Sequence, residues 1–282
     1  MRGRIASGPA LDEVVWSRDV AGEETVMLPS VRAGKYEVTP CVDTVLDFEP
    51  QQFFPDVPLR VWQEIPGALS EEGKIRFNVG CFLIRGGGKT ILVDTGLGPA
   101  PTGRFAGRDG KLDQQLRQAG VGFSDVDTVL FTHLHVDHVG WSVRWSGGVP
   151  TPVFPRATYL APRADWECYI QPKYLEAQRY AYLKESVMPL DQLGLLRLID
   201  DGHRLDDGVR TWLTPGHTPG HMAVVVGDRS DQVVLTGDLF HHVAQVQHPE
   251  WCPAADLEPA RSRETRAQAF QRLAQEGSLV GG

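Results

Sequence analysis

The sequence predicts a layered α/β domain with two mixed β-sheets, and three observations lead to this prediction. Strand-like apolar segments come first, a segment of helical composition follows at residues 163–190, and strand-like segments return before a final helix. The chain has 282 residues, which is enough for a large domain with a substantial core. We find no linker that would separate two independent domains, so one layered domain is expected.

Residues 1–35 show no strong periodicity, and we interpret them as an N-terminal extension with one strand around Thr25–Leu28. The domain itself is expected at 36–282. Its first strand is predicted in "KYEVTPCVDTVLDF", where the pattern becomes typical of β-structure.

A hairpin is predicted in "IRFNVGCFLIRGGGKTILVDTGLG", because two apolar runs flank Gly86–Gly88. Residues 112–120 combine two leucines with a terminal glycine, which predicts a short helix and its C-cap. The continuous apolar run at 126–131 predicts a buried strand. These elements complete the first half of the domain.

The second half begins with "RADWECYIQPKYLEAQRYAYLKESVMPL", which is helical in composition. Strands are then predicted in "RLIDDGHRLDDGVRTWLTPGH", "HMAVVVG" and "DQVVLTGDLF". Residues 258–277 predict a charged amphipathic helix, and the closing "SLVGG" starts like a strand. Strands and helices thus recur in both halves of the domain.

Composition and charge narrow the function classes. The chain is 41% hydrophobic and 23% charged, which is typical of a soluble globular protein. A net charge of −8 and scattered Lys and Arg argue against nucleic-acid or anionic-membrane partners. The four cysteines form no CxxC pair, and neither a signal peptide nor a membrane span is seen, so a cytoplasmic protein is expected. The expected partner is a small-molecule substrate, and the sequence leaves a homodimer open.

"FTHLHVDHVG" at 131–140 places His133, His135, Asp137 and His138 directly after the predicted buried strand. Imidazole nitrogens and carboxylates are the ligands that zinc and related metals prefer. A solvent-exposed polar loop is the alternative. The apolar strand before the cluster and "VGW" after it argue against such a loop. The cluster therefore predicts a metal site.

Three further motifs accompany this cluster. They are Asp94 at the end of "ILVDTGLG", His217 and His221 in "TPGHTPGH", and Asp238 in "VVLTGDLF". Together with H-x-H-x-D-H, and in this order, they resemble the motifs of the metallo-β-lactamase superfamily over about residues 36–282. The resemblance implies a four-layer αββα sandwich, in which two mixed β-sheets are flanked by helices.

The resemblance also implies two adjacent metal positions, and the histidine at 135 favours zinc over iron. The first zinc ion would be held by His133, His135 and His217, the second by Asp137 and His138, and the Asp238 carboxylate would bridge both. Asp94 is expected to orient the ligands, and His221 is expected to form hydrogen bonds near the site. Trp141 and Trp145 are expected to line the pocket, together with Phe240 and His241.

The implied activity is hydrolysis of an ester, lactone, thioester or phosphotriester by a hydroxide that two zinc ions share. Asp137 would orient the hydroxide and pass a proton to the leaving group. Lactonases of the superfamily usually carry a tyrosine shortly after the bridging aspartate, whereas this chain has Phe240 and His241 there, which is more similar to methyl parathion hydrolase. Two alternatives remain, a persulfide dioxygenase with one iron ion and a binding module with a decayed second site.

One departure concerns the second metal position. Members of the superfamily usually supply a last histidine just after a C-terminal strand, whereas the last histidine here is His248. We therefore expect the domain at 36–282 to be truncated just before its last strand and its final metal ligand. The second zinc site would then be incomplete, or His241 and His242 would substitute.

Overall fold

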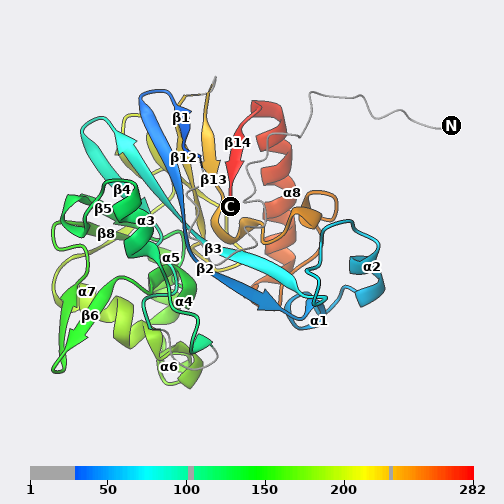
Figure 1. Cartoon of the computed structure of the whole chain (residues 1–282), viewed down its shortest axis with the longest axis horizontal. Coiled ribbons are helices and arrows are strands. Elements are labelled where there is room, and N and C mark those ends of the chain that lie inside the picture. Colours follow the sequence, from blue (N-terminus) through cyan, green and yellow to red (C-terminus); the bar gives the residue numbers. More distant parts are fainter. Residues whose placement is uncertain (1–28, 101–104, 229–230) are drawn as a thin grey trace.

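The computed structural model describes residues 29–100, 105–228 and 231–282 (Figure 1). The strand expected around Thr25–Leu28 lies outside these residues. Twelve of the strands form two mixed sheets, one of seven strands in the order β1-β2-β3-β4-β5-β8-β9 and one of five in the order β10-β11-β12-β13-β14. Two mixed sheets were predicted from the sequence, and the prediction is confirmed.

The larger sheet is antiparallel from β1 to β4 and parallel from β4 through β5 and β8 to β9. Its strands are β1 (Val31–Ala33), β2 (Tyr36–Phe48), β3 (Ile75–Gly86), β4 (Lys89–Val93), β5 (Thr128–Leu130), β8 (Thr158–Pro162) and β9 (Leu196–Ile199). The hairpin around Gly86–Gly88 is β3–β4, as expected. β1 falls within the segment assigned to the extension and pairs with β2.

The smaller sheet is antiparallel except for its last pair, β13 and β14, which is parallel. Its strands are β10 (Arg204–Asp206), β11 (Val209–Leu213), β12 (Met222–Val226), β13 (Val233–Leu235) and β14 (Leu279–Gly281). A separate hairpin, β6 (Val143–Ser146) and β7 (Val149–Pro152), stands apart from both sheets.

Helices cover the outer faces of the two sheets (Figure 1). The α-helices are α1 (Pro50–Phe53), α2 (Leu59–Gln63), α3 (Leu112–Gln118), α4 (Val136–Val139), α5 (Arg163–Tyr169), α6 (Pro172–Leu175), α7 (Met188–Gln192) and α8 (Pro259–Glu276). Single-turn 3₁₀ segments are η3 (Phe123–Asp125), η4 (Gln178–Tyr180), η6 (Gly237–Leu239) and η7 (Val243–Val246), and η5 (Leu183–Val187) is a π-helical turn. The helices predicted at 112–120 and 258–277 are α3 and α8.

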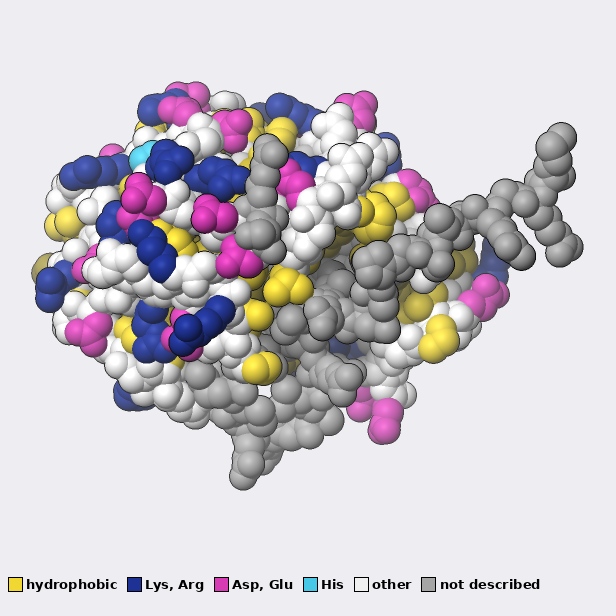
Figure 2. All heavy atoms as spheres, turned by 90° about the horizontal axis from the view of Figure 1, so that it is seen from above, with side chains coloured by type: hydrophobic (Ala, Val, Ile, Leu, Met, Phe, Trp, Pro, Cys, Tyr) yellow, Lys and Arg dark blue, Asp and Glu magenta, His cyan; other side chains and the backbone are white. Residues whose placement is uncertain are grey.

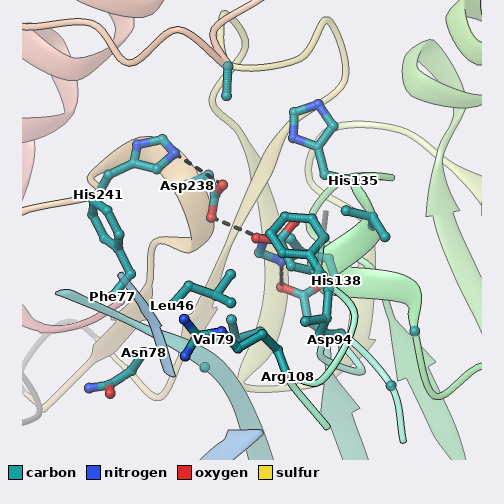
Figure 3. Close-up of a pocket in the computed structure, with 18 of the residues that line it drawn as sticks. Leu46, Phe77, Asn78, Val79, Asp94, Arg108, His135, His138, Asp238 and His241 are labelled. Carbon is teal, nitrogen blue, oxygen red and sulfur yellow. Dashed lines mark hydrogen bonds and ion pairs between the residues drawn. The ribbon is translucent and has the colours of Figure 1, made fainter. Parts of the chain in front are cut away.

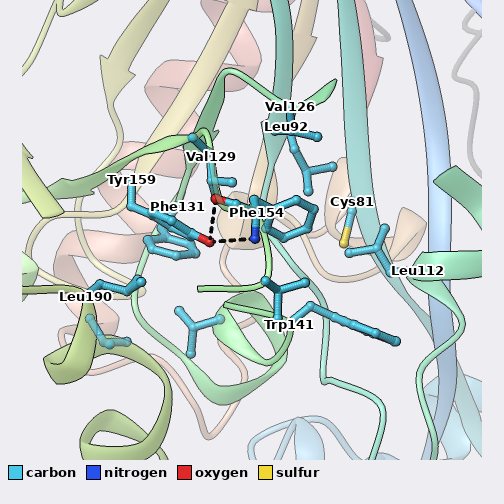
Figure 4. Close-up of a cluster of buried hydrophobic side chains, with 14 of the residues drawn as sticks. Cys81, Leu92, Leu112, Val126, Val129, Phe131, Trp141, Phe154, Tyr159 and Leu190 are labelled. Atoms are coloured by element: carbon cyan, nitrogen blue, oxygen red, sulfur yellow. Dashed lines mark hydrogen bonds between the residues drawn. The ribbon is translucent and has the colours of Figure 1, made fainter. Parts of the chain in front are cut away.

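The layering follows from strands that are apolar on both faces. In β4, Ile91 and Val93 belong to the core between the two sheets, whereas Leu92 points to the outer core with Leu112 and Leu116 of α3. Figure 4 shows this outer core, in which the Tyr159 hydroxyl accepts the Phe154 N–H at 3.1 Å.

On the other side of the molecule, Val225 and Val234 of the smaller sheet pack against Ala269 and Leu273 of α8. Helix, sheet, sheet and helix therefore form the four layers, and the expected αββα sandwich is confirmed.

The helical composition of residues 163–190 is confirmed, because α5, α6, η4, η5 and α7 follow one another between 163 and 192. The α-helices are short, with seven residues in α5, four in α6 and five in α7. Pro172 stands in the first turn of α6, where proline starts a helix but prevents a preceding one from continuing through it. The strands β6, β7 and β8 precede this helical segment and were not predicted.

None of the helices among the described residues is long and apolar enough to cross a membrane. Figure 2 shows Lys and Arg side chains interspersed with Asp and Glu on one face of the molecule. That face therefore lacks the single-sign charge that nucleic-acid binding requires.

Candidate metal centre

The motif residues meet at one end of the sandwich because the strands that precede them end there. Asp94 follows β4, the histidine cluster follows β5, His217 and His221 lie between β11 and β12, and Asp238 follows β13. β4 and β5 are parallel neighbours, so their carboxyl ends share one edge of the sheet. Segments far apart in the sequence thus bring their polar side chains into one space.

Asp94 is the one non-glycine residue with a left-handed backbone among the described residues (φ 60°). Such a conformation is costly and persists where the surroundings fix it. Its carboxylate accepts the Thr132 N–H and the Thr132 hydroxyl, both at 2.7 Å, and the Nδ1–H of His138 at 2.8 Å. Asp94 therefore holds the start of the histidine loop, as its expected orienting role requires.

Four side chains form a compact group of metal donors: the Nδ1 or Nε2 atoms of His133, His135 and His217 and a carboxylate oxygen of Asp238 lie within 4.8 Å of one another. His135 Nδ1 is 2.9 Å from His217 Nε2, which is itself 3.1 Å from Asp238 Oδ2. The Nε2 atom of His133 is buried and has no hydrogen-bond partner among the described residues. An orphaned nitrogen that points into this group fits a metal ion, and three imidazoles with one carboxylate match the donors that zinc prefers.

Two of these histidines, His217 and His133, have their opposite nitrogens fixed by oxygen acceptors. His217 Nδ1 donates to Asp256 Oδ1 at 2.9 Å, and His133 Nδ1 lies 3.1 Å from the Thr132 hydroxyl oxygen. Such partners set the tautomer and the ring orientation of metal-binding histidines. The Nε2 atoms of both rings are therefore directed to the centre of the group.

Asp238 also faces the expected second position. Its Oδ1 atom lies 3.2 Å from His138 Nε2, whereas Oδ2 contacts His217 and accepts the Nε2–H of His241 at 3.1 Å (Figure 3). Asp137 lines the same cavity and is half-buried, and its carboxylate has no hydrogen-bond partner among the described residues. His138 thus contacts the Oδ1 atom of Asp238, and Asp137 lines the same cavity.

The buried histidines of the site fall into two groups, one with lowered and one with raised pKa values. Burial lowers the pKa of His133 and His135 well below their ordinary value, so both rings are neutral. Burial also opposes charge on His138 and His217, but Asp238 beside both outweighs it, so the pKa of His138 lies well above its usual value and that of His217 rises to about 9. Burial alone would raise the pKa of Asp238, and the histidines around it, His138 foremost, hold it well below its usual range.

His221 does not belong to the donor group. Its Nε2 atom accepts the Asp238 N–H at 3.0 Å, and its Nδ1–H donates to the Thr214 hydroxyl at 2.8 Å. Burial lowers the pKa of His221 to about 3. Both ring nitrogens are thus in use, and the hydrogen bond to the backbone of Asp238 is the kind of role the sequence predicted for it.

Three buried aspartates that support the site were not identified from the sequence. Asp165 accepts the Leu134 N–H at 3.1 Å, the Thr218 hydroxyl at 2.9 Å and the Gly220 N–H at 2.6 Å. It therefore ties the histidine loop after β5 to the loop that carries His217. No feature of the sequence around Asp165 marks this role.

Asp43 is the second of these aspartates, and it lies where the pairing of β2 with β3 shifts register. A bulge of this kind turns a strand side chain in a new direction. The carboxylate accepts the Leu97 N–H at 2.7 Å, the Leu112 N–H at 2.9 Å and the indole N–H of Trp141 at 2.8 Å. An aspartate within an apolar strand was the signal that could have found it.

Asp256 is the third, and it couples His217 to a buried arginine. One carboxylate oxygen accepts from His217, and the other lies 3.3 Å from Nη2 of Arg266, whose side chain is fully buried. Burial opposes the charge of Asp256, but His217 beside it holds the pKa of this carboxyl well below its usual value. The ring of His217 is thereby fixed from behind.

The four residues predicted to line the pocket differ in how exposed they are. Trp141, Trp145, Phe240 and His241 all line a cavity of about 1980 Å³ beside the donor group. Trp141 and Phe240 are nearly buried, whereas Trp145 is half exposed and donates its indole N–H to the Glu185 carbonyl at 2.9 Å. The cavity is large enough for a small-molecule substrate.

Replacing Asp256 with asparagine is expected to weaken zinc binding about 10–100-fold, because His217 would lose the charged acceptor that fixes its ring. Zinc affinity measured by competition with a chromophoric chelator tests this. Asp191 is exposed and does not line the cavity, so Asp191→Asn is the matched control and should leave the affinity unchanged. An unaltered zinc affinity in Asp256→Asn would contradict the positioning role.

Comparison with known proteins agrees with this architecture. The family model described as the metallo-beta-lactamase superfamily matches residues 76–276. A probable metallo-hydrolase of Bacillus subtilis (strain 168), YybB, is 31% identical over 175 residues, which cover 62% of this chain and 68% of the relative. An N-acyl homoserine lactonase of Bacillus cereus is 26% identical over 193 residues, with coverage of 63% and 70%.

Two solved structures extend the comparison to most of the chain. The hydrolase AbOPH of the beta lactamase superfamily has a TM-score of 0.75 and 27% identity, and covers 89% of this chain and 87% of that chain. AidC, a dizinc quorum-quenching lactonase, has a TM-score of 0.76 over 91% of this chain and 90% of that chain, and at 22% identity it shows the fold alone. The chain therefore belongs to the metallo-β-lactamase superfamily and is a metal-dependent hydrolase.

Proposed function

We propose that the protein is a zinc-dependent hydrolase that binds two zinc ions and cleaves a small ester, lactone, thioester or phosphotriester. The observation that carries the proposal is the convergence of His133, His135, His217 and Asp238 on one point, with an orphaned nitrogen among their donor atoms. His138 and Asp137 would contribute to the second position beside Asp238.

Bound zinc lowers the pKa of a water molecule towards neutrality and polarises a carbonyl or phosphoryl oxygen. The protein residues supply position and proton transfer. Asp94, Thr132 and Asp256 hold the ligand rings in place. Asp137, whose carboxylate is not engaged by other described residues, would accept a proton from the nucleophilic water and deliver it to the leaving group.

Carboxylic esters and lactones are the first substrates to test. Support comes from relatives at 25–28% identity that are named N-acyl homoserine lactonases. Phosphotriesters belong in the same panel because Phe240 and His241, which follow Asp238, resemble the corresponding residues of methyl parathion hydrolase.

The decisive experiment combines metal content with a hydrolysis panel. We expect two equivalents of tightly bound zinc, and turnover of at least one of an aryl ester, a lactone, a thioester and a phosphotriester. Chelation should abolish the turnover, and added zinc should restore it. One equivalent of iron without hydrolysis would support the dioxygenase instead, and the absence of tightly bound metal would support a binding module.

A further inference from the structure

The cavity beside the donor group has an apolar wall that belongs to the long strands β2 and β3. These strands have 13 and 12 residues, and their ends run past the sandwich towards α1 (Figure 1). Leu46 of β2 is paired with Phe77 of β3, and both side chains line the cavity with Val79. Such a wall accommodates an apolar chain of a substrate.

The charge of the cavity differs from that of the whole protein. Among the described residues outside the metal centre, four arginine side chains and two carboxylate side chains line it, although the chain carries a net charge of −8. The charged lining residues are Arg76, Arg108, Arg144, Arg179, Asp47 and Glu185. A local excess of positive charge in an acidic protein favours an anionic ligand.

The four arginines are not equivalent. Arg76 is paired with Asp47 at 2.9 Å, and the guanidinium of Arg179 lies 4.8 Å from the ring centre of Tyr180. Arg108 and Arg144 have no ion pair with any described residue. Positive charge in the cavity is therefore uncompensated mainly at these two positions.

Arg108 is placed differently from Arg144. Figure 3 shows its side chain lying across the apolar wall next to Leu46 and Val79, on the cavity side opposite His135. Arg144 belongs to β6, in the separate hairpin. Of these two arginines, Arg108 is the one that places a guanidinium along the wall that an acyl chain would follow.

We propose that Arg108 binds a carboxylate at the far end of the substrate's apolar acyl chain, so that the natural substrate is an anionic, amphiphilic ester or lactone. The inference deepens the proposed function and rests on it. Guanidinium and carboxylate match in charge and in bidentate geometry, which makes the pairing specific although Arg108 is exposed. The leaving-group end of the substrate would then lie at the metal centre.

Binding of two amide probes, which keep the shape of an ester but resist hydrolysis, tests the proposal directly. Adipic acid monoanilide carries the terminal carboxylate, and hexananilide ends in a methyl group at the same position. We expect the zinc-loaded protein to bind the anionic probe about 5–10-fold more tightly, as measured by isothermal titration calorimetry. Equal binding of the two probes would overturn the proposal.

Variants locate the anion site. In Arg108→Met the preference should fall to near unity, with binding of hexananilide within twofold of the unaltered protein. Arg144→Met removes the same charge from the same cavity and should retain the preference. Arg108→Lys should keep part of it, because the charge stays while the planar fork is lost. A preference that survives Arg108→Met, or that is lost equally in Arg144→Met, would contradict the assignment to Arg108.

Hydrolysis of the matched 4-nitrophenyl esters separates this inference from the proposed function. Turnover of both mono-4-nitrophenyl adipate and 4-nitrophenyl hexanoate at equal kcat/KM supports the hydrolase and contradicts the anion site. Failure to hydrolyse either ester, together with a persistent anilide preference that depends on Arg108, contradicts the hydrolysis of aryl esters and supports the anion site.

Discussion

Replacing Asp238 with asparagine is expected to lower kcat/KM at least about 10³-fold and to abolish tight zinc binding. One carboxylate serves both predicted metal positions, since its Oδ2 atom lies 3.1 Å from His217 Nε2 and its Oδ1 atom 3.2 Å from His138 Nε2. Losing several kcal/mol of charge stabilisation corresponds to about three factors of ten in rate. Zinc content by mass spectrometry and steady-state kinetics measure the two effects.

The matched control is Asp56→Asn, an exposed aspartate outside the cavity. It should retain two zinc ions and full activity. If Asp238→Asn keeps both metal ions and more than about a tenth of the activity, the bridging role is wrong. Circular dichroism of both variants checks that the fold is retained.

Replacing Arg266 with methionine is expected to destabilise the protein by about 3–5 kcal/mol. The guanidinium is fully buried and donates to the carbonyls of Leu239, Pro249 and Trp251 at 2.8–2.9 Å and to the Ser262 hydroxyl at 2.8 Å. Methionine fills part of the volume but leaves these acceptors unpaired. A Tm decrease of roughly 10 °C in thermal unfolding is the expected readout.

Arg261→Met on the same helix provides the comparison. Arg261 is half exposed and pairs with Glu258 at 3.2 Å, so its loss should change stability by less than about 1 kcal/mol. Arg266→Met should also weaken zinc binding, because Asp256 would lose its cationic neighbour behind His217. Equal Tm values for the two variants would refute the role given to the buried guanidinium.

The layered fold was predictable because its signals are local. The apolar runs of β4, β5, β12 and β13 are buried on both faces, and such runs are readable without knowledge of their neighbours. The helical segment at 163–190 was predictable from its composition as well. The strands β6–β8 were not predicted, because they depend on tertiary pairing that no local pattern indicates.

Part of the donor group was predictable for the same reason, because His133 and His135 lie in one short motif, whereas His217 and Asp238 were assigned to it through the resemblance to the superfamily. Their roles as zinc ligands remain predictions until metal is measured. The supporting aspartates were not predictable, since Asp165 and Asp256 act through loops 31–55 and 39 residues away in the sequence. The sequence around a single carboxylate in a loop does not indicate which distant residue it will contact.

Asp165 has a consequence for the order of events in folding. Its three partners are separated from it by 31 to 55 residues, and His135 meets His217 across 82 residues. Closing loops of this length costs chain entropy before any contact compensates for it, so these contacts form late. A newly made chain would offer zinc the short motif with His133 and His135, but His217 and Asp238 would not yet lie beside it. Metal binding would therefore stabilise the folded domain and lower its unfolding rate, and it would not raise the folding rate.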